Sequence, residues 1–179
     1  FYFVLTDRFS NGDPSNDKGG YGGGPDDHGF DPTRVSHYHG GDFAGLMDRM
    51  EYLVNLGISS VWVTPPFKNK PVQSGTAGYH GYWILDFLQI DPHLGSNDIF
   101  RGFVRKAHDN GLKVTMDIIT NHTADVIGYK GGNYSYRSKA DAPYVDCNGQ
   151  EFSAKAHAWN GLGDPDDFPS LCVNRSFPH

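Results

Sequence analysis

The order of apolar and polar segments limits the fold of this chain more than any other feature of the sequence. Two segments rich in β-branched and aromatic residues, 1–6 and 60–64, are typical of strands, and a third such segment begins at Lys113. Between them, residues 42–56 and 97–110 repeat apolar side chains at helical spacing, and a glycine follows each repeat. Long polar loops follow the first two strands, whereas short joins follow the helices.

Long loops after strands and short joins after helices are typical of an α/β protein with a (β/α)8 TIM barrel, whose βα loops build a site on one face. In this interpretation the chain carries the first three β/α units of the barrel. A doubly wound open sheet is the alternative that the pattern leaves open. The strand that begins at Lys113 is rich in apolar residues, and we expect it to be buried on both faces.

Two polar residues, Asn121 and His122, close the third apolar segment. The carboxyl end of a strand is where ligands bind in a parallel sheet covered by helices, so this pair marks a candidate site. The alternative is that the two residues only begin a turn. Within the same strand we expect Asp117 to have a structural hydrogen-bonding role, and we expect Trp62 of the second strand to lie in the core.

Residues 123–179 differ in composition from the rest of the chain. They are rich in Gly, Asp, Asn, Pro and Tyr and show no helical periodicity. We interpret them as an irregular domain inserted after the third strand, or as disorder, and their aromatic residues favour order. The expected domains are 1–122, the N-terminal part of the barrel, and 123–179, an incomplete inserted domain. Neither end of the sequence has a closing element, so we expect a piece of a longer protein.

The charge of the chain argues against several classes of partner. A net charge of -6 and a mean hydropathy of -0.53 disfavour nucleic acid and membrane surfaces, and no apolar run is long enough to span a bilayer. We expect a monomer. Cys147 and Cys172 are either free thiols or one disulfide. The disulfide is favoured because a covalent link stabilises a polar loop region, and it implies a secreted, extracellular protein.

The loop after the first strand contains candidate metal ligands. Four closely spaced side chains carry hard oxygen atoms: Asn11, Asp13, Asn16 and Asp17. Such ligands suit calcium better than a softer metal, although the run taken alone is more typical of a solvated turn. Further along the loop, His37 and His39 form an H-x-H pair that could bind a transition metal. Surface loop histidines are the favoured interpretation of this pair.

Five motifs occur in order along the chain. They are Thr6-Asp7-Arg8-Phe9, Gly40-Gly41-Asp42, residues 57–65, residues 78–83 with Asp86 after them, and residues 117–122 with the form D-x-x-x-N-H. Together they resemble the motifs of glycoside hydrolase family 13, the α-amylase family. The resemblance covers nearly the whole chain and implies a catalytic (β/α)8 barrel with a B domain inserted after its third strand.

The resemblance also implies roles for individual residues. Tyr82 resembles the aromatic residue on which a sugar ring stacks, and His122 resembles the imidazole that hydrogen-bonds this sugar. His80 and Trp83 belong to the same substrate-binding set. Asn121 resembles a ligand of the calcium ion between the barrel and the B domain. A second calcium site is implied for six residues: Asn11, Asp13, Asn16, Asp17, Gly40 through its carbonyl, and Asp42.

The activity that the resemblance implies is retaining cleavage of α-1,4-glucosidic bonds in starch-like polysaccharides, with an α-glucan as the partner. The family's catalytic carboxylates are expected beyond residue 179, so this chain alone is expected to be inactive. Two alternatives stay open: a cyclodextrin glucanotransferase-like transglycosylase, and a non-catalytic carbohydrate-binding homologue. Pro65-Pro66 replaces the polar residues that follow the second strand in many glucanotransferases, which puts transferase activity in doubt.

Overall fold

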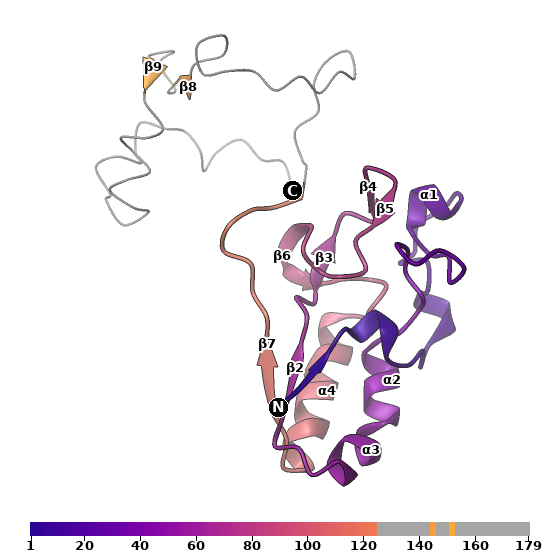
Figure 1. Ribbon diagram of the computed structural model, residues 1–179, viewed down its shortest axis with the longest axis vertical. Coiled ribbons are helices and arrows are strands. Elements are labelled where there is room, and N and C mark those ends of the chain that lie inside the picture. Colours follow the sequence, from indigo (N-terminus) through magenta and orange to yellow (C-terminus); the bar gives the residue numbers. More distant parts are fainter. Residues whose placement is uncertain (125–143, 146–150, 153–179) are drawn as a thin grey trace. The chain divides into compact units, whose positions relative to one another are not determined.

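A parallel sheet organises the computed structural model, which describes residues 1–124, 144–145 and 151–152 (Figure 1). Its strands are β1 (Tyr2–Val4), β2 (Ser60–Val63) and β7 (Lys113–Met116), in the order β1-β2-β7. Phe3 lies opposite Trp62, and Trp62 lies opposite Thr115 on the next strand. The predicted strands are confirmed, each ending earlier than predicted. Three parallel strands fit a barrel and an open sheet equally well.

The helices follow the strands as the periodicity predicts. They are α2 (Phe43–Asp48), α3 (Met50–Asn55) and α4 (Asn97–Asp109). The single helix predicted over 42–56 is divided into α2 and α3 because the backbone of Arg49 leaves the helical region, at φ −100° and ψ 17°. Ser96 caps α4, since its hydroxyl accepts the N–H of Ile99 at 3.2 Å.

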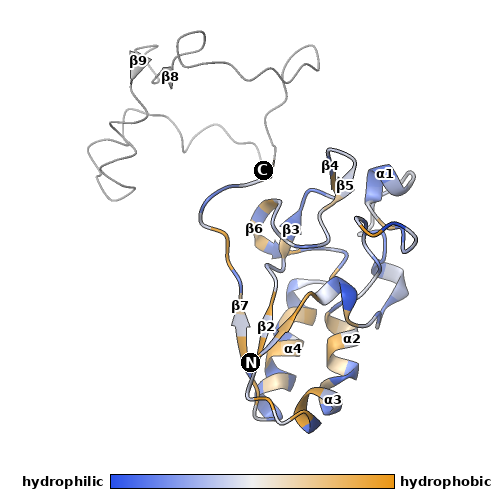
Figure 2. Cartoon of the chain, viewed as in Figure 1, coloured by the Kyte–Doolittle hydropathy of each residue, from blue (hydrophilic) through white to orange (hydrophobic). Residues whose placement is uncertain are grey.

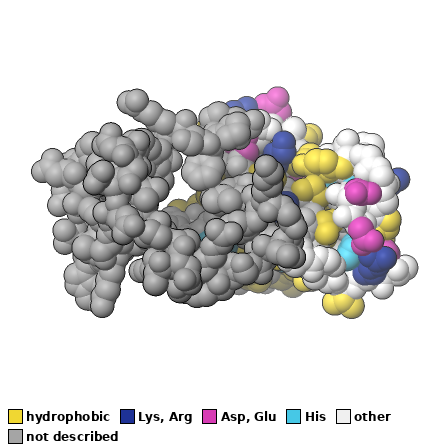
Figure 3. Space-filling model, turned by 90° about the horizontal axis from the view of Figure 1, so that it is seen from above, with side chains coloured by type: hydrophobic (Ala, Val, Ile, Leu, Met, Phe, Trp, Pro, Cys, Tyr) yellow, Lys and Arg dark blue, Asp and Glu magenta, His cyan; other side chains and the backbone are white. Residues whose placement is uncertain are grey.

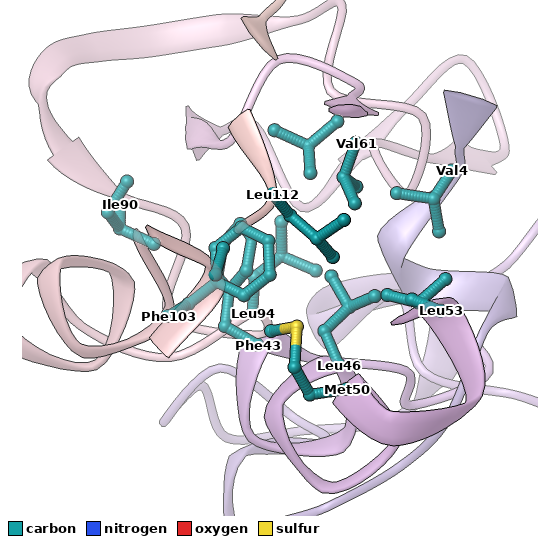
Figure 4. Packing of buried hydrophobic residues seen from close by; sticks show 12 residues of the cluster. Val4, Phe43, Leu46, Met50, Leu53, Val61, Ile90, Leu94, Phe103 and Leu112 are labelled. Carbon is teal, nitrogen blue, oxygen red and sulfur yellow. The ribbon is translucent and has the colours of Figure 1, made fainter. Parts of the chain in front are cut away.

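A hydrophobic core joins the helices to one face of the sheet (Figure 4). The rings of Phe43 on α2 and Phe103 on α4 lie 5.3 Å apart between their centroids, and both side chains are fully buried. Figure 2 shows apolar residues along these strands and helices, with polar residues on the outer sides of the helices. The cluster consists of Val4, Phe43, Leu46, Met50, Leu53, Val61, Val63, Ile90, Leu94, Phe103, Ala107 and Leu112.

The opposite face of the sheet corrects two expectations. Successive side chains of a strand point to opposite faces, so Val61 and Val63 face the helices while Trp62 faces away from them. Trp62 is 40% exposed and packs edge-on against Phe3 rather than lying in the core. The strand β7 is not buried on both faces: Lys113, Thr115 and Met116 are exposed because β7 lies at the edge of the described sheet.

The two long loops contain short elements that the sequence analysis did not predict. The first loop forms 3-10 turns η1 (Thr6–Arg8) and η2 (Pro14–Asn16) and the short helix α1 (Pro25–His28). The second loop forms β3 (Phe67–Asn69), β4 (Val72–Gln73), β5 (Thr76–Ala77) and β6 (Ile84–Ile90), with β3 antiparallel to β6 and β4 antiparallel to β5. Both loops leave the carboxyl ends of parallel strands, where ligands bind in such folds.

The chain divides into two compact units, Phe1–Ile127 and Gly128–His179. In the second unit, β8 (Tyr144–Val145) pairs antiparallel with β9 (Glu151–Phe152). Cys147 and Cys172 lie outside the described residues, so their pairing stays a prediction. The domain boundary predicted after residue 122 also stays a prediction.

The described surface mixes charged and apolar side chains. On the face in Figure 3, acidic, basic and hydrophobic side chains lie interspersed over the part that the structure describes. Three of the large exposed hydrophobic residues, Leu85, Phe87 and Leu88, belong to β6. Within the described residues, no helix combines the length and hydrophobicity needed to cross a membrane.

Candidate functional site

The loop of residues 78–83 packs closely on the end of β2. The N–H of Gly81 donates to the carbonyl of Gly78 at 3.0 Å, which closes a turn. Gly81 has a φ of +88°, and a Cβ at this position would lie 2.1 Å from the carbonyl oxygen of Pro65. Only glycine fits both the backbone angle and the space. The turn therefore fixes the side chains on either side of Gly81 relative to the sheet.

Those side chains form an aromatic group around His80. The imidazole lies 5.7 Å from the ring of Tyr82 at an interplanar angle of 26°, and 4.6 Å from the ring of Trp83 at 85°. Tyr79 adds an edge contact at 5.2 Å. Tyr82 and Trp83 are half-buried, so each keeps an accessible part of its ring. We call residues 79–83 the platform.

The hydrogen bond of His80 defines its tautomer. Its Nδ1 accepts the backbone N–H of Tyr82 at 3.0 Å, so the neutral ring carries its proton on Nε2. Burial lowers the pKa of His80, which also favours this neutral form. Among the described residues the Nε2–H has no partner. The platform therefore offers one hydrogen-bond donor beside two aromatic rings.

Asp117 holds the Tyr82 ring from the neighbouring strand. The Tyr82 hydroxyl donates to Asp117 Oδ2 at 2.9 Å, and the N–H of Asp117 donates to the carbonyl of Val63 at 3.1 Å. Burial and then the Asp117 carboxylate raise the pKa of Tyr82. Asp117 lies one residue beyond β7 and is half-buried, not inside a buried strand as expected. Its expected hydrogen-bonding role is confirmed.

The structure brings His122 to the same place. Its Nε2 lies 3.1 Å from the carbonyl oxygen of Tyr82 and donates to it, because a carbonyl oxygen only accepts. Its Nδ1 then accepts the side-chain N–H of Asn121 at 3.0 Å. Both residues are exposed. The substrate-binding residues predicted from the sequence, Tyr82, His80, Trp83 and His122, therefore lie together, although their roles stay predictions.

The predicted calcium ligands of the first loop also lie close together. The amide Nδ2 of Asn11 donates to Asp17 Oδ1 at 2.7 Å. Gly40, with a φ of +92°, lies against this pair: a Cβ there would be 2.5 Å from Asn11 Nδ2 and 2.6 Å from Asp17 Oδ1. Burial raises the pKa of Asp17, whereas the hydrogen bonds of Ser15 lower the pKa of Asp13.

Asp42 organises this loop through its buried carboxylate. Its Oδ1 accepts the N–H groups of Gly12 at 3.0 Å and Gly45 at 2.6 Å, and the latter bond caps α2. Its Oδ2 accepts the N–H of Asp13 at 2.9 Å and the amide of Asn16 at 3.0 Å. The oxygen of this amide, Asn16 Oδ1, is buried without a hydrogen-bond partner in the described structure.

Two functional candidates were not recognised individually from the sequence. Asp7 is buried and accepts the N–H groups of His39 at 2.9 Å and Gly40 at 3.1 Å. Burial outweighs these bonds and the charge of Arg8, and raises the pKa of Asp7 to about 6. The Arg8 guanidinium lies 4.2 Å from the centre of the Tyr79 ring. In the sequence, Asp7 and Arg8 are marked only by their position in the first motif, Thr6-Asp7-Arg8-Phe9.

The expectation that His37 and His39 are surface residues is wrong for His37. Its side chain is 1% exposed because the loop folds back over it, and its Nε2 lies 3.2 Å from the guanidinium of Arg34. His39 is half-buried and its Nε2 donates to the carbonyl of Arg34 at 3.1 Å. In the described part of the chain, no group of three or more His, Cys, Asp or Glu side chains is arranged to hold a metal ion.

Comparison with known proteins gives a consistent set of relatives. The family model described as "Alpha amylase, catalytic domain" matches residues 3–165. The chain is 48% identical over 134 residues to an alpha-amylase of Streptomyces lividans, covering 73% of this chain and 15% of that protein. It is 38% identical over 144 residues to the periplasmic alpha-amylase of Escherichia coli, covering 73% and 21%.

Among solved structures, a cyclomaltodextrin glucanotransferase with a three-domain ABC distribution matches with a TM-score of 0.62 and 42% identity. The match covers 69% of this chain and 26% of that chain. The matches therefore span only 15% to 26% of the length of these three relatives.

Proposed function

This chain belongs to the α-amylase family, and from this premise we propose that the whole protein cleaves α-1,4-glucosidic bonds in starch-like polysaccharides with retention of configuration. The observation that carries the proposal is the platform beside the carboxyl ends of β2 and β7. A neutral sugar presents an apolar ring face and hydroxyl groups, so it binds where an aromatic ring lies beside hydrogen-bonding groups. The geometry of Tyr82, His80 and Trp83 supplies both kinds of contact.

Each platform residue has a distinct role in this proposal. The Tyr82 ring, held by Asp117, forms the stacking surface for one sugar ring. The Nε2–H of His80 donates to a sugar hydroxyl, because its Nδ1 is already occupied by the Tyr82 amide. His122 exchanges its bond to the Tyr82 carbonyl for one to the sugar when substrate binds. Trp83 closes the side of the platform behind His80.

We propose that the catalytic carboxylates lie outside the described residues. Retaining cleavage needs two carboxyl groups about 5–5.5 Å apart. Asp117 is the carboxylate that contacts the platform in the described structure, and its Oδ2 is held by the Tyr82 hydroxyl. In the same proposal the three parallel strands belong to an eight-stranded barrel and residues 123–179 to an inserted B domain. Residues 1–179 alone would then hydrolyse no starch.

We also propose calcium as the structural cofactor of the first loop. The residues fit such an ion: Asn16 Oδ1 is a buried oxygen without a partner in the described structure, and the glycine at position 40 lets the backbone approach Asn11 and Asp17 where a Cβ would clash. Asp13 adds a second carboxylate nearby. The carboxylate of Asp42 already accepts four hydrogen bonds. Its main role would therefore be to position the other ligands, in addition to any direct contact with the ion.

A second calcium is proposed at Asn121. The Asn121 amide nitrogen donates to His122, which leaves its oxygen for an ion. Secretion and a monomeric state complete the proposal. A relative named periplasmic supports export, and a Cys147–Cys172 disulfide would fit an oxidising compartment.

The test is an assay of the full-length protein on soluble starch with calcium present. We expect linear maltooligosaccharides, and NMR of the first products should show the α-anomer. Cyclic products would favour the transglycosylase, in line with the glucanotransferase among the similar structures. Starch binding without any cleavage would support the non-catalytic homologue. A protein that neither binds nor cleaves starch would refute the proposal.

A further inference from the structure

We propose that Asn69, Asp91 and His93 are positioning residues that hold the platform in place from beneath. The proposal rests on the proposed function, because it concerns the same sugar site. Each of the three residues is 1% exposed. Burial of polar groups lowers stability unless each group has a hydrogen-bond partner. The partners of these three side chains are therefore described in turn.

The connection begins at the backbone of Trp83. Its N–H donates to Asn69 Oδ1 at 2.6 Å. The Asn69 amide nitrogen donates in turn to the carbonyl of Phe67 at 2.6 Å, which fixes the side chain with its oxygen toward Trp83. On the other side of the loop, the N–H of Lys70 donates to the Trp83 carbonyl at 2.9 Å. Asn69, the last residue of β3, and Lys70 directly after it thus bind both backbone polar groups of Trp83.

Asp91 links Asn69 to His93 by hydrogen bonds. Its Oδ2 accepts the backbone N–H of Asn69 at 2.7 Å, and its Oδ1 accepts the backbone N–H of His93 at 2.9 Å. The same Oδ1 lies 2.8 Å from Nδ1 of the His93 ring. Both carboxyl oxygens of Asp91 therefore accept a backbone N–H, one from Asn69 and one from His93.

Both ring nitrogens of His93 have hydrogen-bonding partners. Its Nε2 lies 2.8 Å from the carbonyl oxygen of His28, and its Nδ1 faces the Asp91 carboxyl group. The His28 carbonyl oxygen can only accept, so Nε2 donates to it. The ring is therefore fixed between Asp91 and the backbone of His28.

Aromatic rings enclose the His93 ring. The Tyr38 ring stacks on it at 3.9 Å with an interplanar angle of 6°, and the Tyr21 ring lies on it at 5.7 Å and 26°. Gly19 passes so close that a Cβ would lie 2.6 Å from the ring. The pKa values of Asp17 and His28 are both affected by the nearby His93 ring. The first loop is thereby connected to the platform through His93, Asp91 and Asn69.

A purely structural role and a positioning role predict different kinetics. Loss of stability removes folded enzyme, which lowers kcat and leaves KM unchanged. Displacement of the platform weakens sugar binding, which raises KM. Ser96→Ala is the matched control, because it removes the cap of α4 without touching the connected residues.

The experiment uses the full-length protein with Asn69→Ala, His93→Gln and the Ser96→Ala control. We expect the first two variants to raise KM for maltooligosaccharides about fivefold or more, the effect of one lost hydrogen bond, whereas the control keeps its KM. An unchanged KM in both would overturn the proposal. If His93→Gln does not fold, Gly19→Ala displaces the same ring by steric contact from the loop side and is scored in the same way.

A second measurement separates this proposal from the proposed function. In hydrogen-exchange NMR, the Trp83 amide should exchange faster with solvent in His93→Gln than in the control. This result would support the positioning role even if the wild-type protein did not cleave starch. Unchanged exchange of the Trp83 amide would refute it.

Discussion

The carboxylate of Asp42 gives the sharpest stability prediction, because one buried side chain accepts four hydrogen bonds. Replacement by alanine removes the cap of α2, which costs about 1 kcal/mol. It also removes the bond to the half-buried Asn16 amide, about 1 kcal/mol, and the bonds to two accessible backbone N–H groups, about 0.5 kcal/mol each. Asp42→Ala should therefore lower the free energy of unfolding of this unit by about 3 kcal/mol.

The assay must separate hydrogen bonding from calcium, since Asp42 also belongs to the proposed calcium loop. Urea unfolding and amide hydrogen exchange should be measured in EDTA and again with calcium. In EDTA the amides of Gly12, Asp13 and Gly45 should lose protection together, because they share one acceptor. If calcium binds this loop, the difference between wild type and variant should grow when calcium is added.

Asp48→Ala is the control, since Asp48 is an exposed aspartate at the other end of α2. Exposed substitutions of this kind usually change stability by less than about 0.5 kcal/mol. An Asp42→Ala protein that stays within about 0.5 kcal/mol of wild type in EDTA would refute the assignment of these bonds. Loss of protection at Gly45 alone would reduce the role of Asp42 to helix capping.

Three further predictions test the platform, the second ion and a buried acid. Tyr82→Ala should raise KM and lower kcat on starch, whereas Tyr82→Phe loses only the bond to Asp117 and should be mild; normal kinetics in the alanine variant would exclude a stacking role. EDTA should lower the melting temperature of the full-length protein, and Asn121→Ala should melt low and respond little to calcium; an unchanged melting curve in EDTA would contradict the site. The pKa of Asp7 is raised from 3.8 to about 6, so the folded state binds more protons than the unfolded state between these values. Stability should therefore fall as pH rises from about 4 to about 6, and urea unfolding should show a smaller fall in Asp7→Asn.

Local signals explain what the sequence predicted correctly. The helix α4 has a capping serine, an apolar stripe and a closing glycine within one short segment, so its bounds could be predicted almost to the residue. The strands were predicted from their β-branched and aromatic residues, and their parallel order follows from the helical crossovers between them. The residues of the platform were recognised through one continuous motif, which is also a local feature.

Features that depend on distant contacts were not predictable in the same way. Trp62 has the composition of a core residue, but its face is set by the register of β2 between its neighbours. The strand β6 was assigned to a loop, because nothing local shows that it pairs with β3. The bond between Tyr82 and Asp117 joins residues that are 35 positions apart, and that between His93 and the carbonyl of His28 spans 65.

The contacts that hold the platform come from three different parts of the chain. Arg8 lies over Tyr79 from the first loop, Asn69 binds the N–H of Trp83 from β3, and Asp117 holds the Tyr82 hydroxyl from the end of β7. Each contact is worth only about 1 kcal/mol, so none of them alone determines the arrangement. The geometry of the site is instead specified by their agreement, because each contact excludes different displacements of a short turn. An aromatic ring positioned from several directions loses little further entropy when a sugar binds, which is how a scaffold of this kind supplies affinity.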